Sequence, residues 1–74
     1  MMNKLKMELT KRGYSFDIEG DFSISIKFLK KIAYIDETLS DKLHIRIENY
    51  EGKKITSNTY KTINGLMKFM RANI

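Results

Sequence analysis

The sequence lacks cysteine, proline and tryptophan, and it contains a single histidine, His44. Without cysteine the chain has neither a disulfide framework nor thiolate ligands for a metal ion. His44 has no thiol to activate, and its neighbours in an alternating segment place it on a solvent-exposed face. The sequence therefore predicts no catalytic residue, no metal site and no cofactor, and we expect a protein that is not an enzyme.

Glycine is also scarce: four glycines stand apart at positions 13, 20, 52 and 65, so no glycine-rich phosphate loop is present. No apolar run is long enough for a transmembrane helix, and the first twelve residues lack the apolar core of a signal peptide. We expect a cytoplasmic protein with no membrane partner. A chain of 74 residues allows one domain, residues 1–74. Such a small domain buries only about 60% of the surface that its unfolded chain exposes.

Charge is unevenly distributed along the chain, which has a formal net charge of +5. Residues 1–13 contain four basic residues and one acidic residue, and residues 53–74 contain five basic residues and no acid. The segment between them is mildly acidic. This asymmetry favours attraction to an anionic partner without identifying it.

The most regular part of the sequence runs from position 14 to position 28, where apolar and polar residues alternate strictly on both sides of Gly20-Asp21. A period of two predicts a β-hairpin with one apolar face and a two-residue turn. The alternation in residues 43–48 predicts another strand, and residues 54–57 are a candidate for a short additional one. Residues 32–35 either continue the second strand beyond a bulge or form a strand of their own.

Helical periodicity occurs at both ends of the chain. Asn3–Arg12 is expected to be a short helix, with Asn3 as its N-cap and Gly13 as the left-handed residue after its end. Near the other end, apolar residues from Tyr60 to Ile74 recur at helical spacing, and residues 57–59 offer three N-cap candidates. Asn64-Gly65 is also a hairpin signal, but the length of the apolar stripe favours a helix.

Together these elements predict an α+β domain of the order α-β-β-β-(β)-α. Its antiparallel meander of three to four strands has one apolar face, so both terminal helices should pack on that face. Phe16, Ile24 and Ile26 would then lie under the helices, whereas Ser25 would lie on the uncovered face.

Two surfaces of this architecture are candidates for binding a larger protein. One is the open face of the sheet, and the other is the exposed face of the last helix, where small residues near Met7 and Phe69 would allow close approach. The candidate residues of the two surfaces are Ser15, Ser25, Lys27, Arg46, Gly65 and Ala72.

An alternative is nucleic-acid binding through a basic layer on the outside of the helices. Lysines that contact phosphates would give salt-dependent binding without sequence preference. The residues concerned are Lys4, Lys11, Lys61 and Lys68 on the helices, extended by Lys53 and Lys54 in a turn.

A short helix, LKMELTKRG, leads directly into a strand that begins with tyrosine, YSFDIEG, and is followed by a meander and a closing helix. In size and topology this resembles small phage-encoded accessory and inhibitor proteins, including some anti-CRISPR proteins. The resemblance implies stoichiometric docking on a protein partner. Because this chain is basic, docking rather than nucleic-acid mimicry would be the mechanism, with the protein acting as a monomer or weak homodimer.

Overall fold

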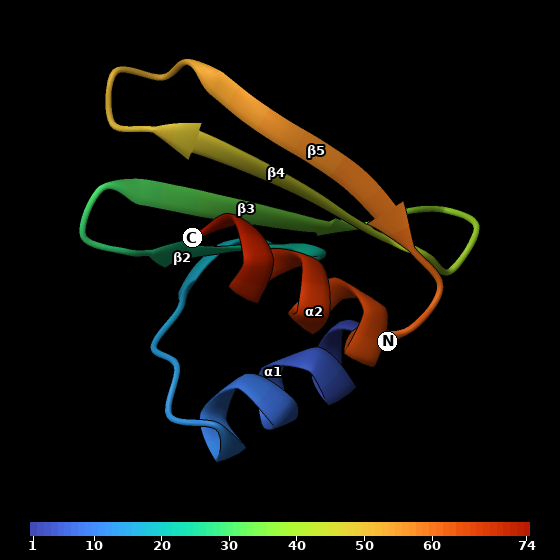
Figure 1. Ribbon diagram of the computed structural model, residues 1–74. Helices are drawn as coiled ribbons and strands as arrows, with labels where there is room; N and C mark the ends of the chain where they lie inside the picture. Colours follow the sequence, from blue (N-terminus) through green and yellow to red (C-terminus); the bar gives the residue numbers. More distant parts are fainter.

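The computed structural model describes residues 1–74 and contains two helices and a five-stranded sheet (Figure 1). All neighbouring strands are antiparallel and follow one another in chain order, which confirms the predicted α+β meander with one strand more than expected. The elements are α1 (Met2–Lys11), β1 (Asp17–Gly20), β2 (Ser23–Lys27), β3 (Lys31–Glu37), β4 (Leu43–Asn49), β5 (Lys54–Tyr60) and α2 (Ile63–Asn73).

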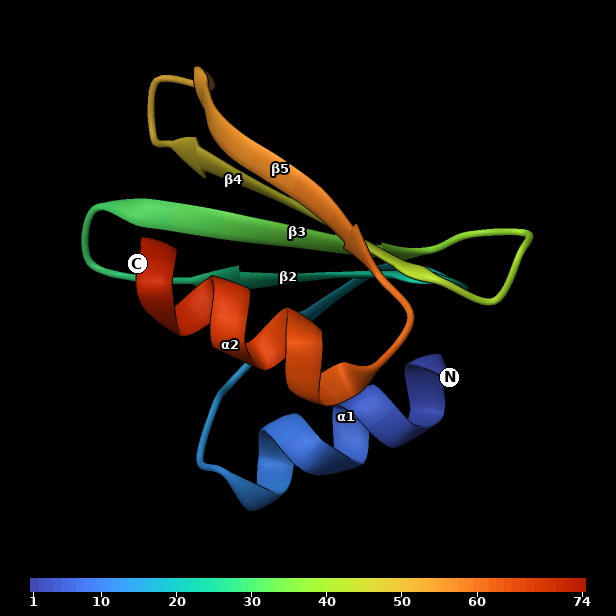
Figure 2. The same ribbon diagram turned by 45° about the vertical axis from the view of Figure 1, so that its right-hand side comes forward.

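Both helices lie on the same side of the sheet, as Figures 1 and 2 show. The strands place their apolar residues on that side because side chains of a strand point alternately to its two faces. Cross-strand pairs such as Ile24 with Ile35, and Ile35 with Ile45, therefore form a continuous apolar surface under the helices. The buried core consists of Met2, Leu5, Leu9, Ile24, Ile26, Ala33, Ile35, Leu43, Ile45, Ile47, Leu66, Met67 and Met70.

The segment containing residues 32–35 forms a separate strand, β3, so the continuation of the second strand is the wrong alternative. A tight turn joins β2 to β3, and the Phe28 N–H donates to the Lys31 carbonyl at 2.8 Å. Reversal of the chain explains the interrupted alternation: Leu29 sits in the turn and is exposed. The segment that could have been one long strand is thus two paired strands, β2 and β3, which accounts for part of the larger number of strands.

The first hairpin differs from the prediction in its length and turn. The first strand begins only at Asp17, and its turn consists of Asp21 and Phe22 instead of Gly20-Asp21. With this two-residue turn and a regular register, the apolar residues of β1 would lie opposite the polar residues of β2. A bulge at Glu19 corrects this, since it brings Ile18 opposite Ile24 and leaves Glu19 as the extra residue.

Helix α1 ends as the sequence predicts but begins differently. Gly13 has φ +85°, the Gly13 N–H donates to the Thr10 carbonyl and the Tyr14 N–H donates to the Leu9 carbonyl. These two bonds form a Schellman motif, which requires the left-handed conformation that glycine adopts at little cost. At the other end Asn3 does not cap the helix, which starts at Met2 without a side-chain cap.

Helix α2 confirms the helical interpretation of the last segment, but the three proposed N-caps were wrong. Residues 57–59 belong to β5, and the helix starts at Ile63 after Thr62. The Thr62 hydroxyl accepts the Gly65 N–H at 3.1 Å and thus satisfies one free N–H of the first turn. Tyr60, at the end of β5, packs on Phe69 of α2 with 5.5 Å between ring centroids.

The Thr62 cap gives a direct test of the start of α2. We expect Thr62→Ala to lower the free energy of unfolding by about 1 kcal/mol, because an N–H of the first helical turn loses its acceptor. Thr62→Ser keeps the hydroxyl and should stay close to wild type. Urea denaturation followed by circular dichroism measures both. Equal stability of wild type and Thr62→Ala would contradict this assignment of the cap.

Candidate functional site

The face of the sheet opposite the helices is covered by no other element (Figures 1 and 2). The strand register arranges polar side chains on this face in cross-strand rows. The register places Asp17, Ser25, Tyr34, Arg46 and Ser57 side by side, so that one row crosses all five strands. Residues directly opposite one another in antiparallel strands lie within contact distance on the same face. We call this side of the sheet the open face.

The centre of the open face is a stacked pair of side chains. The Arg46 guanidinium lies over the Tyr34 ring, 4.8 Å from its centroid, and its Nε donates to the Glu48 carboxylate. All three residues are half-buried. An arginine held by a ring on one side and a carboxylate on the other has a restricted set of rotamers, so its charge has a defined position on the surface.

Ser25, the neighbour of Tyr34 in this row, is buried, with 1% of its surface exposed. The prediction that Ser25 lies exposed on the open face is therefore wrong, although the helices are not what covers it. Its hydroxyl donates to Glu19 Oε2 at 2.9 Å, and Glu19 comes from the bulge of β1. The edge hairpin thus seals this part of the open face, and Ser25 cannot contact a partner.

Two further rows complete the open face. On one side the Ser23 hydroxyl donates to Asp36, and His44 Nδ1 lies 2.9 Å from Thr59 Oγ1. On the other side Ile32 is buried between its cross-strand neighbours. The open face carries charges of both signs: the acids are Asp17, Glu19, Asp36 and Glu48, and the bases are Lys27, Arg46 and Lys54.

The other predicted partner-binding residues are scattered. Lys27 is exposed on the open face and forms an ion pair with Asp17 at 3.8 Å. Ser15 is exposed but precedes β1, and Ala72 is exposed on α2 on the other side of the molecule. The structure therefore brings together only Lys27, Arg46 and the buried Ser25.

Gly65 does not offer a free small-residue surface on α2. A Cβ atom at this position would lie 2.9 Å from Tyr60 Cδ1 and 3.1 Å from Thr62 Oγ1. The absence of a side chain thus accommodates the Tyr60 ring of the same molecule, and Phe69 is half-buried against that ring. The expectation that Gly65 and Phe69 form an open surface for a partner is therefore wrong, because the Tyr60 ring lies against both.

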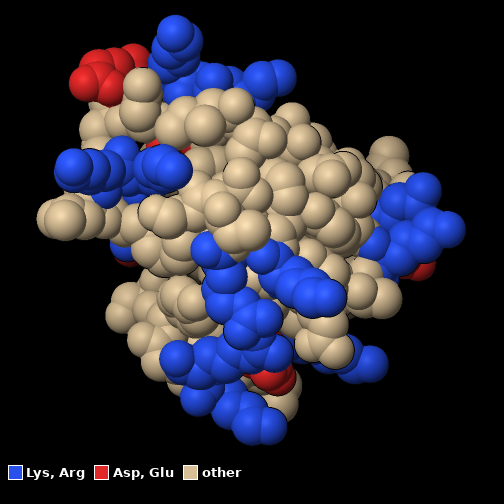
Figure 3. All heavy atoms as spheres, in the orientation of Figure 1, with Lys and Arg blue, Asp and Glu red and all other residues tan.

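The six lysines proposed for nucleic-acid binding are all exposed. On the face drawn in Figure 3, basic side chains gather over the two helices. The register pairs Lys54 with Glu48 on the open face, so Lys54 lies on the side of the sheet away from the helices and does not extend the helical group. Lys53 lies in the connection between β4 and β5. The remaining four, Lys4, Lys11, Lys61 and Lys68, lie on or next to the helices.

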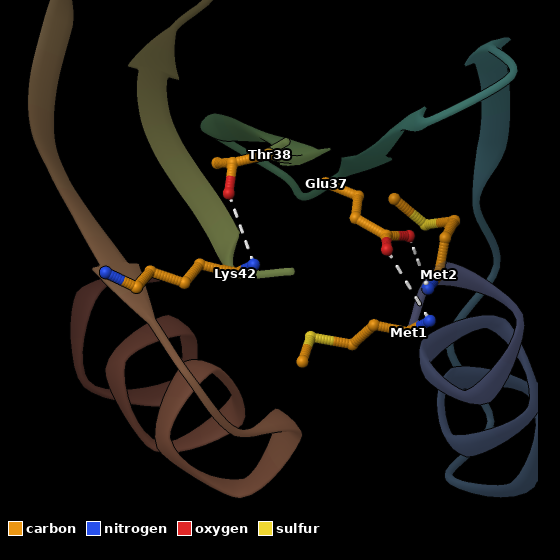
Figure 4. Close-up of polar contacts among 5 residues, drawn as sticks. All are labelled: Met1, Met2, Glu37, Thr38 and Lys42. Carbon is orange, nitrogen blue, oxygen red and sulfur yellow. Dashed lines mark hydrogen bonds and ion pairs between the residues drawn. The ribbon is translucent and has the colours of Figure 1, made fainter. Parts of the chain in front are cut away.

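A second feature lies at the end of the sheet where the chain begins (Figure 4). Glu37 of β3 accepts the Met2 N–H at 2.8 Å and lies 3.6 Å from the amino group of Met1, which ties α1 to the sheet. Beside Glu37 is a shallow hollow of about 210 Å³ bordered by the exposed Phe22 and Leu39. No group of three histidine, cysteine, aspartate or glutamate side chains is arranged to hold a metal ion.

Comparison with known proteins finds no similar protein. No family model, curated protein or solved structure matches the chain. The helices of the structure are too short and too polar to cross a membrane.

Sequence reasoning missed Tyr34 and Glu48 at the centre of the open face, and Glu19 in the bulge of the edge strand β1. The position of Tyr34 could be inferred from the alternation of polar and apolar residues in β3 and β4, where both Tyr34 and Arg46 fall on the polar side. The stack itself depends on the pairing of Tyr34 with Arg46, which is known only once the strands and their register are fixed.

The burial of Ser25 can be tested by placing a charge there. We expect Ser25→Asp to lower the free energy of unfolding by about 3 kcal/mol, because an unpaired carboxylate would be buried beside Glu19. Ser57→Asp introduces the same charge in the same row at the sheet edge and should cost far less. Both are measured by urea denaturation. Similar losses at the two positions would contradict the burial of Ser25 beside Glu19.

Proposed function

We propose that the protein is a non-enzymatic binding protein that docks stoichiometrically on a larger protein through its open face. The observation that carries this proposal is the Arg46–Tyr34 stack in the middle of a sheet face that neither helix covers. The resemblance of the whole chain to small phage-encoded inhibitors in size and topology supports an inhibitory role in the cytoplasm.

The composition of the open face favours a protein partner. Tyrosine and arginine are enriched among the residues that contribute most to protein–protein binding, especially near the centre of an interface. Here the stack and Glu48 already order Arg46 in the free protein. Less side-chain entropy is therefore lost when a partner binds.

The charges of the open face support the same choice. Acidic residues are at least as numerous as basic ones on this face, although the whole chain carries +5. Phosphates would be repelled by the acids, whereas a protein surface with charges of both signs can complement such a pattern. The open face thus favours protein over nucleic acid.

The experiment is capture of the partner from the native host with immobilised protein, followed by mass identification and affinity measurement. We expect Arg46→Ala to weaken binding of the captured protein at least about tenfold, in the range of an interface hot spot. Lys68→Ala, on the exposed side of α2, should bind like wild type. Both variants should keep the wild-type circular dichroism spectrum.

Loss of binding in Lys68→Ala with unchanged binding in Arg46→Ala would place the interface on the helices and contradict the proposal. So would a captured partner that binds both variants and Lys27→Glu as tightly as wild type.

The alternative function, nucleic-acid binding, is favoured by one observation, the gathering of basic side chains over the helices in Figure 3. It predicts binding of duplex or single-stranded DNA or RNA that weakens steeply with salt and is reduced by Lys11→Glu and Lys68→Glu. Fluorescence anisotropy at several salt concentrations tests it. No binding at low salt would remove this alternative.

A further inference from the structure

Strand β5 forms one edge of the sheet, and no element of the chain lies beyond it (Figures 1 and 2). The edge spans the seven residues Lys54–Tyr60, which is longer than the four-residue strand at the opposite edge. An uncovered edge strand presents main-chain N–H and C=O groups that can pair with another extended chain. The position of these groups follows from the register.

The hairpin between β4 and β5 fixes which main-chain groups face outward. The Asn49 N–H donates to the Lys53 carbonyl at 3.0 Å, so alternate residues of β4 from Asn49 onward bond towards β5. Ile47 and Ile45 therefore bond to Thr56 and Asn58, their partners in the register. The residues between them on β5, Ser57 and Thr59, direct their N–H and C=O groups away from the sheet.

These outward groups are only partly satisfied within the molecule. The Thr59 N–H donates to the Oδ1 atom of Asn58 at 2.8 Å. The register leaves the Ser57 N–H and the carbonyl groups of Ser57 and Thr59 directed towards solvent. The single irregularity of the strand, a bulge next to Lys54, lies at its beginning and leaves this stretch regular.

We propose that the β5 edge binds an extended, acidic segment of the protein partner, which adds a sixth strand to the sheet. This inference rests on the proposed function, because it takes the partner to be a protein. The segment would pair with the outward groups of Ser57 and Thr59. It would also extend the open face, since the Ser57 side chain belongs to the same cross-strand row as Tyr34 and Arg46.

Charge selects the kind of segment that fits. Lys53 and Lys54 precede the regular part of β5 and Lys61 follows it, and all three are exposed. No acidic residue occurs anywhere in residues 53–74. A strand with acidic residues at both ends would meet a base at each end of β5.

The same charges disfavour a second copy of this chain as the occupant. Antiparallel pairing of β5 with its copy would bring Lys54 of each molecule near Lys61 of the other. Like charges opposite one another in neighbouring strands destabilise the pair. The structure therefore favours a different protein over self-association at this edge.

The test is selection of linear peptides from a random display library on the immobilised protein, with synthetic versions of the enriched peptides studied by NMR. We expect enriched peptides to be acidic and to protect the Ser57 amide from hydrogen exchange. Ser57→Pro removes the outward N–H without removing a bond to β4, and edge strands tolerate such a proline. It should weaken binding at least about tenfold, a loss equivalent to 1.4 kcal/mol.

Two further variants make the test independent of the folding of Ser57→Pro. Ser57→Thr keeps the N–H and should bind the peptides like wild type. Lys61→Glu replaces a base by an acid at one end of β5, so it should lower the affinity for the acidic peptides at least about tenfold. Absence of enriched peptides, enrichment of basic or neutral peptides, or chemical-shift changes confined to other elements would overturn the inference. So would wild-type affinity in a folded Ser57→Pro variant and in Lys61→Glu.

Failure of this inference can be distinguished from failure of the proposed function. A captured partner that depends on Arg46 but not on Ser57 or Lys61 supports docking on the open face and overturns strand addition alone. A partner that depends on neither Arg46 nor the β5 edge overturns both.

Discussion

The structure depends on a single apolar sheet face that must be buried by two helices. Three strands, β2 to β4, supply that face, and both helices are used to cover it, so the other side of the sheet is left open. The polar side chains of the open face therefore satisfy one another: Ser25 bonds to Glu19, Ser23 to Asp36 and Arg46 to Glu48. The surface proposed to bind a partner is thus a consequence of how the core is built.

Local periodicity predicted much of the fold because burial on one face imposes it. The strands β2 and β4, the end of α1 at Gly13 and the helical nature of the last segment all follow from it. The error in the start of the last helix occurs where the same residue types are common in two kinds of local structure. Serine, asparagine and threonine at 57–59 are good N-caps but also suit an exposed edge strand, and only the later Thr62 caps the helix.

The candidate site was less predictable because it is made of contacts between strands. Alternation places Arg46 and Ser25 on the same side as Tyr34, but it does not reveal that the β1 bulge brings Glu19 over Ser25. Likewise, helical spacing places Gly65 away from the apolar stripe of α2, but not against the Tyr60 ring of the preceding strand. Both corrections arise from a neighbouring element whose position depends on register.

The central claim, that the open face is the surface that contacts a protein partner, is tested most directly by hydroxyl-radical footprinting of the complex with the captured partner. Tyr34 and His44 report on the open face, and the exposed Met7 reports on α1. We predict lower oxidation of Tyr34 and His44 in the complex, with Met7 unchanged. Protection of Met7 with unchanged oxidation of Tyr34 and His44 would contradict the claim.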